Sequence, residues 1–162
     1  MHDLKFTSAQ VAEAIGMSHD NFRAHLSRKD WRIIGKEQPE NGKAHSFSVH
    51  DVLGYALARI LTTYGIDTKT AFQRAMFDFA HTGDDERGPG EIYDSESLGL
   101  TFYVYSHGAR LGECLAEKRI TSVGSLLRVN ARERAEAAVI VDLTAMRDRV
   151  FQALGLDSRD YE

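Results

Sequence analysis

The sequence from Phe6 to Leu26 is Phe-Thr-Ser-Ala-Gln-Val-Ala-Glu-Ala-Ile-Gly-Met-Ser-His-Asp-Asn-Phe-Arg-Ala-His-Leu, and it predicts two short helices joined by a tight turn. Thr7 and Gln10 have the spacing of a capping box, in which the threonine hydroxyl accepts from the amide of residue 10. Apolar residues then recur at helical spacing, and Gly16 suits the left-handed position that ends a helix. We therefore expect a first helix over about residues 8–16.

The second helix is predicted over about residues 18–28, with Ser18 as its N-cap. Phe22 and Leu26 lie four residues apart and are expected to point inward. The opposite face then carries Asp20, Ala24 and Ser27, flanked by Asn21, Arg23 and Arg28. Together with Ser18 and His19 at the start of the helix, these residues are the candidates for DNA contact. Arginine, asparagine and alanine suit direct readout of guanine, adenine and the thymine methyl group. An ordinary solvated helix face is the alternative at this point.

Two β-prone segments, Trp31–Ile34 and His45–Ser48, flank a loop that contains Asn41-Gly42. An Asn-Gly pair between such segments predicts a hairpin. A β-ribbon after the second helix would form a wing over residues 35–45, with Lys36 and Lys43 offered to phosphates. Glutamates in the same loop dilute this charge, and a plain surface loop is the alternative.

Two longer helices follow. Ser48 and Asp51 form a second capping motif, and an apolar stripe extends from there to Gly65. Asp67 caps a fourth helix with another apolar stripe, which ends near Phe79. We expect both stripes to be core or subunit interface.

These residues together resemble the MerR superfamily of winged helix-turn-helix proteins, with its relatives among phage regulators, excisionases and small-terminase DNA-binding domains. The resemblance covers roughly residues 1–75. The matching segments are Val11-Ala12 to Gly16-Met17-Ser18 for the first helix and turn, Asn21-Phe22-Arg23-Ala24-His25 for the recognition helix, Phe47-Ser48-Val49-His50-Asp51-Val52 after the wing, and Ile60 to Gly65 at the end of the apolar helix.

The resemblance implies that the second helix enters the major groove, that the wing contacts the flanking backbone, and that a homodimer binds a two-fold site of double-stranded DNA. Arg23 falls on the family's recognition-helix arginine, and Lys43 and His45 fall near its phosphate-contacting wing positions. The chain departs from the family at Ala24 and His25, which replace paired tyrosines. The long dimer helix of MerR activators has no counterpart, so effector-triggered activation is not implied.

The C-terminal half predicts a small α/β unit. Residues 82–90 are rich in glycine and acids and are expected to be a linker between a domain over 1–81 and a second over 91–156, with a tail over 157–162. The second unit is expected to serve self-association or partner binding. The fold class is therefore α+β.

Within this unit, residues 100–106 alternate like a strand, and residues 137–143 are expected to form a buried strand. Asp142 or Thr144 would cap a final helix that ends at Gly155. Residues 110–118 and 123–129 fit a helix or a strand equally well.

Composition and charge limit the classes of protein to which this chain can belong. The chain has 162 residues, 43% hydrophobic and 27% charged residues, and a net charge of −4. Residues 1–76 carry 10 basic and 8 acidic residues, a charge of +2, whereas residues 77–162 carry 10 and 16, a charge of −6. A weakly basic half beside an acidic half is compatible with an attached DNA-binding module. The single cysteine, Cys114, and the lack of a predicted signal peptide or membrane span favour the cytoplasm.

The sequence shows no clear catalytic or metal-binding motif. Cys114, His107 and His81 have no ordering motif around them, and the seven histidines show no metal-like spacing. We therefore expect no enzyme activity, no metal and no cofactor. The prediction is a cytoplasmic, sequence-specific transcriptional regulator. The alternatives are a phage packaging or recombination accessory protein, and a protein-docking module that does not bind DNA.

Overall fold

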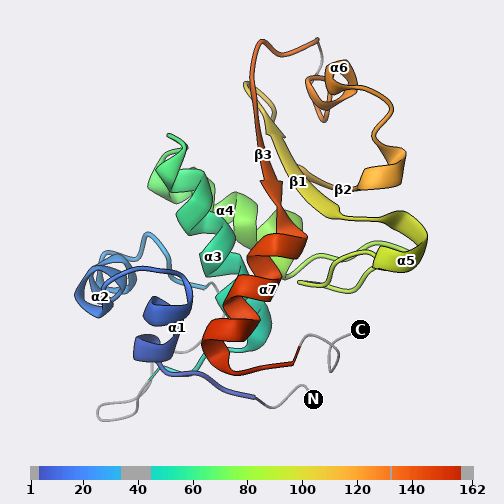
Figure 1. The fold of residues 1–162 in the computed structure, drawn as a ribbon. Helices are drawn as coiled ribbons and strands as arrows, with labels where there is room; N and C mark the ends of the chain where they lie inside the picture. The colour runs from blue at the N-terminus through green and yellow to red at the C-terminus, as the bar shows by residue number, and fades with distance from the viewer. Residues whose placement is uncertain (1–3, 34–44, 132, 158–162) are drawn as a thin grey trace.

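The computed structural model describes residues 4–33, 45–131 and 133–157, and it confirms a mixed α+β fold (Figure 1). The helices are α1 (Ser8–Ala14), α2 (His19–Ser27), α3 (Val49–Thr63), α4 (Thr68–Ala75), α5 (Ser95–Leu98), α6 (Val123–Leu126) and α7 (Leu143–Leu154), with a π-helical turn η1 (Met76–Ala80) and a 3-10 turn η2 (Glu117–Arg119). The strands are β1 (Thr101–Ser106), β2 (Glu113–Ala116) and β3 (Ala138–Asp142). They form an antiparallel sheet in the order β2-β1-β3.

The predicted helix caps are confirmed. The amide of Gln10 donates to the Thr7 hydroxyl over 3.3 Å, and the Thr7 amide donates to the Gln10 side chain over 2.9 Å. Ser48 and Asp51 form the same reciprocal pair at the start of α3. Side-chain oxygens at the N-termini also cap α2, α4 and α7. These bonds satisfy amides that a helix cannot satisfy itself, so the helix starts are fixed locally.

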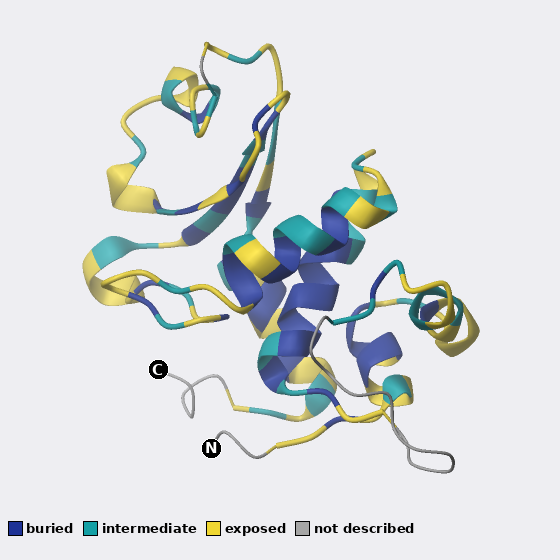
Figure 2. Ribbon diagram, turned by 180° about the vertical axis from the view of Figure 1, so that it is seen from behind, coloured by how far each residue is buried: buried dark blue, intermediate teal, exposed yellow. Residues whose placement is uncertain are grey.

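Helix α3 is the centre of the molecule. Its residues from Asp51 to Ala58 are all buried, and α1, α4, η1 and α7 pack around it. Figure 2 shows this helix as a dark blue rod between the α1–α2 pair and the sheet. Burial on all sides explains its nearly continuous apolar sequence.

The two halves of the chain share one hydrophobic cluster. It contains Val11 and Phe22 from the N-terminal half and Tyr103, Val141 and Phe151 from the C-terminal half. Helix α7 packs against both α1 and α3. The C-terminal part therefore docks on the N-terminal part through a common core.

Residues 82–90, the expected linker, lie against this core. Arg87 is buried, pairs with Asp84 (Nε to Oδ2 3.2 Å), and places its guanidinium 5.8 Å from the Phe79 ring centroid and 5.9 Å from that of Tyr93. The amide of Gly90 donates to the Phe79 carbonyl over 2.9 Å. The segment is thus tied to η1 and to the start of the C-terminal half.

A polar network fastens the sheet to η1. The carboxylate of Asp78 accepts from the Tyr103 hydroxyl over 2.9 Å, from the Gly112 amide over 2.8 Å and from Arg74 over 3.0 Å. Burial raises the pKa of Asp78, while the bonds from Gly112 and Tyr103 and the charge of Arg74 act in the opposite direction. One carboxylate thereby joins α4, β1 and the turn before β2.

The structure settles the two segments that the sequence left open and corrects one strand prediction. The segment 110–118 contains β2, and the segment 123–129 contains the short helix α6. The segment 137–143 does contain a strand, but the expected burial was wrong: β3 is an edge strand, and Ile140 is 46% exposed. The apolar run indicated the strand, whereas its place in the sheet depends on tertiary pairing.

The structure describes the two borders of the expected wing. Residues 31–33 form no strand, although the sequence predicted a β-segment there. Phe47 forms an antiparallel bridge with Phe6, with backbone bonds of 2.9 and 3.0 Å. The expected hairpin at Asn41-Gly42 lies outside the described residues.

The packing of α3 on η1 generates a stability prediction at Gly54. A Cβ at this position would lie 2.6 Å from the Met76 sulfur and 2.8 Å from the Ala80 Cβ. Alanine favours a helix over glycine by about 1 kcal/mol, but overpacking costs about 1–3 kcal/mol. We expect Gly54→Ala to lower the free energy of unfolding in urea. Gly124→Ala is the control, since its Cβ would meet only the Ser122 hydroxyl at 3.7 Å. Equal stability of the two variants would contradict this packing.

Candidate nucleic-acid interface

An aromatic cluster anchors α2. Phe22 is fully buried, and its ring meets those of Trp31, Phe47 and Tyr55 edge-on at centroid distances of 6.5, 5.8 and 5.0 Å. Edge-on contacts place the positive rim of one ring against the negative face of another, so they add directional energy to burial. This contact fixes which side of α2 faces inward.

Trp31 holds the end of α2 in place. The Tyr55 hydroxyl donates to the Trp31 carbonyl over 2.8 Å, and the Trp31 indole N–H donates to the Thr68 carbonyl over 3.3 Å. The chain after α2 is thus bonded to α3 and to the first residue of α4. Lys29, with φ of 64°, makes the left-handed step that leads out of the helix.

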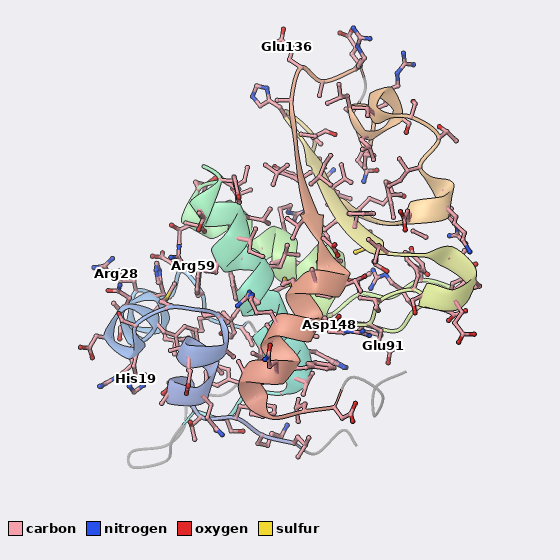
Figure 3. The ribbon with its side chains drawn as sticks, viewed as in Figure 1. His19, Arg28, Arg59, Glu91, Glu136 and Asp148 are labelled. Atoms are coloured by element: carbon pink, nitrogen blue, oxygen red, sulfur yellow. The ribbon has the colours of Figure 1, made fainter. Side chains whose placement is uncertain are left out.

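The outward side of α2 carries the candidate residues that the sequence predicted. Those exposed are Ser18, His19, Asp20, Asn21, Arg23, Ser27 and Arg28, while Ala24 is half-buried. Figure 3 shows His19 and Arg28 pointing away from α3 and from the sheet. The structure therefore brings eight of the predicted residues together: six lie in α2, and Ser18 and Arg28 are its N-cap and C-cap.

These side chains differ in their freedom to contact a ligand. His19 Nε2 lies 2.9 Å from the Ser8 hydroxyl, and the Ser27 hydroxyl donates to the Arg23 carbonyl over 2.9 Å. Within the described ranges, the guanidinium groups of Arg23 and Arg28 have no hydrogen bond or ion pair. The two arginines are therefore the side chains of α2 best able to donate to a new partner.

The three predicted wing residues have different outcomes. His45 is exposed and stacks on the Phe47 ring, with centroids 6.0 Å apart. Lys36 and Lys43 lie outside the described residues, so their contribution stays a prediction.

Sequence reasoning missed two basic residues beside α2. Arg59, on α3, donates to the Thr63 hydroxyl over 2.9 Å, and Figure 3 shows it on the same side of the molecule as Arg28. Lys29 is exposed at the end of α2. The polar position of Arg59 in an apolar stripe was visible in the sequence, but its closeness to α2 depends on how the helices cross. Asp20 and Asp30 lie in the same region, so the surface carries mixed charge with an excess of basic groups.

His25 lies between this surface and the core. Its ring stacks on that of Trp31, with centroids 4.4 Å apart and an interplanar angle of 14°. Its Nδ1 is buried and has no hydrogen-bond partner among the described residues. Burial lowers the pKa of His25; Arg28 and Arg59 also lower it, and Asp30 opposes them. The neutral ring is thus favoured in the folded protein.

The three residues that the sequence suggested as candidates for catalysis lie in different surroundings. Cys114 is buried on β2, and burial raises its pKa to about 12. His81 Nε2 lies 3.1 Å from the Asp51 carboxylate, and His107 is exposed just after β1. Among the described residues, no group of three or more His, Cys, Asp or Glu side chains is arranged to hold a metal ion.

Comparison with known proteins does not assign this chain to a family: no protein-family model matches it, and no curated protein matches its sequence. Within the described part of the chain, no helix has both the length and the apolar character needed to cross a membrane.

The environment of His25 predicts a pH-dependent stability. Its pKa is lowered in the folded state from an ordinary value of 6.5, so the unfolded chain binds the proton more readily. Stability should therefore fall as the pH drops below about 6.5 toward the folded-state pKa, and this loss is absent above that range. We expect His25→Phe, which keeps a ring against Trp31, to reduce the pH dependence of urea unfolding between about pH 7 and pH 5. His107→Phe, at an exposed site, is the control. An unchanged slope in His25→Phe would show that this ring is not the group responsible.

Proposed function

We propose that this protein is a sequence-specific regulator of transcription that binds double-stranded DNA, with α2 in the major groove. The observation that carries the proposal is the two-sided character of α2. Phe22 locks one side into an aromatic cluster, and the other side presents two arginines that have no partner within the described residues. A helix with side chains is about 10–12 Å across, and the major groove of B-DNA is about 12 Å wide.

The residue types on α2 support readout of base edges. A guanidinium group can donate two parallel hydrogen bonds to the O6 and N7 atoms of guanine, and an asparagine side chain can make a matching pair with adenine. Arg23 lies at the middle of the helix, and Asn21 lies in its first turn. Their exposure leaves both available for such contacts.

Basic residues around α2 support contacts to phosphates. Lys29, Arg59 and His45 come from segments that flank the helix, and Lys36 and Lys43 belong to the expected wing. Each neutralised phosphate releases counterions, which makes affinity depend on salt. A modest cluster of this kind favours binding that weakens clearly as salt is added.

The MerR-like winged helix-turn-helix is part of the same proposal. Two capped helices with a Gly-x-Ser turn between them, followed by the Phe6–Phe47 bridge and the capped start of α3, fit the order of that module. The bridge holds the chain entering α3 beside the segment before α1, where a β-ribbon would join it. We also propose a cytoplasmic location, as expected for a DNA-binding regulator.

The proposal is tested by selecting bound fragments from genomic DNA and titrating them by gel shift at several salt concentrations. Arg23→Ala should weaken binding to the selected site by about 1–3 kcal/mol and relax the base preference at one position. Lys43→Ala should weaken binding to all sequences and reduce the salt slope by about one. Arg134→Ala, an exposed arginine in the C-terminal half, is the matched control and should bind as the wild type does.

Two outcomes contradict the proposal. The first is a wild-type protein that shifts no fragment even at low salt. The second is equal weakening by Arg23→Ala and Arg134→Ala, because it would separate binding from the α2 surface.

A further inference from the structure

Within the described part of the chain, the outer edge of β3 is an unpaired strand edge. β3 pairs with β1 on one side only, and no described residue pairs with its other side. The sequence from Ala137 to Val141 is Ala-Ala-Val-Ile-Val, without a charge or a proline. Protein sheets usually protect such an edge with charged residues, proline or a bulge, because an open apolar edge pairs with other chains. The opposite edge, β2, begins with an exposed glutamate, Glu113.

The hydrogen-bond register shows which backbone groups of β3 are available. The His107 amide donates to the Ala137 carbonyl over 2.8 Å, so these two residues form a hydrogen-bonded pair of the β1–β3 ladder. Such pairs alternate along antiparallel strands, which assigns Val139 and Val141 to the bonds with β1. The N–H and C=O groups of Ala138 and Ile140 therefore point toward the open edge.

A groove runs along this edge. It has a volume of about 640 Å³ and is lined by β3, by Ile60 and Tyr64 at the end of α3, and by Arg149 of α7. Tyr64 is 71% exposed, and Ile140 is 46% exposed. Both values are high for large apolar side chains, so the surface at this edge has apolar area left to bury.

We propose that a second copy of this chain occupies the groove, with the two β3 strands pairing antiparallel about a two-fold axis at Ile140. The paired Ile140 residues would exchange both backbone hydrogen bonds, and Ala138 of each copy would face Asp142 of the other. The two sheets would then form one continuous antiparallel sheet. Antiparallel pairing keeps both helical layers on the same side, so Tyr64 of each copy would lie over the joined strands.

Charge favours a second copy as the occupant. A two-fold axis places identical residues opposite each other, and at its centre these are uncharged isoleucines, so no like charges meet there. The same register places Glu136 of one copy opposite Thr144 of the other, in the first turn of α7. The basic Arg149 lines the groove on the same helix, so this side of the groove offers a positive charge to the glutamate. Figure 3 shows Glu136 at the far end of β3 from α7, as this antiparallel match requires.

The inference is tested by light scattering across the micromolar range. The wild type should have a mass near twice 18.1 kDa. Ile140→Lys should have the mass of a monomer, because the ammonium groups of the two introduced lysines would face each other across the two-fold axis. Leu111→Lys is the matched control: Leu111 is 45% exposed, lies in the turn between β1 and β2, and should leave the dimer intact. Circular dichroism and urea unfolding check that both variants fold.

Amide hydrogen exchange tests the register independently of any variant. In the wild-type dimer, the amides of Ala138 and Ile140 should exchange slowly although they face away from β1. A monomeric wild type, a dimeric Ile140→Lys variant, or fast exchange at Ile140 within a dimer each overturns the inference. These results do not depend on DNA binding, so this inference and the proposed function can fail separately.

Discussion

Burial of one phenylalanine ring determines what the N-terminal part of this protein can present to a partner. Phe22 lies in the middle of α2 and contacts the rings of Trp31, Phe47 and Tyr55. Fully burying such a ring contributes about 1.5–3 kcal/mol, and each well-oriented aromatic pair adds about 0.5–1.5 kcal/mol. A helix of nine residues is too short to be stable alone, so these contacts supply both its stability and its rotation about its own axis. The same energy therefore holds the helix and selects its outward face.

Helix α3 connects this aromatic cluster to the rest of the chain. Tyr55 on one side of α3 completes the aromatic cluster, and Gly54 on another side lets η1 approach closely enough for Met76 and Ala80 to contact the helix backbone. Within η1, Asp78 binds the hydroxyl of Tyr103 and so positions the sheet. Each of these contacts joins segments that are distant in sequence, and together they make the two halves one packed body.

Local signals in the sequence predicted the local structure well. Thr7, Ser18, Ser48 and Asp67 were identified as helix caps because the capping bond depends on only four consecutive residues, and each forms that bond. The strand character of residues 100–106 also followed from local alternation. For the candidate site, the inward position of Phe22 and the outward set on α2 followed from helical periodicity alone.

What the sequence could not supply depends on non-local contacts. The run of small and branched residues in β3 fits a central strand and an edge strand equally well, and only the pairing order distinguishes them. Arg59 lies three residues after the buried Ala56, and nothing local indicates that α3 brings it toward α2. Residues 82–90 have a linker's composition, yet the burial of Arg87 between two aromatic rings ties them to the core.

The two proposed surfaces are connected through α7. This helix starts directly after β3, and Arg149, which lines the β3 groove, donates to the carbonyl of Ala14 at the end of α1 over 3.0 Å. Helix α1 in turn contacts α2 and is joined to it by the Ser8–His19 bond. The path from the strand edge to α2 therefore contains packed helices and hydrogen bonds throughout, with no extended linker. Because a packed interior resists deformation, pairing of two β3 edges would fix the separation and orientation of the two α2 helices. Two-fold DNA sites with half-sites at one defined spacing would then be favoured over sites with variable spacing.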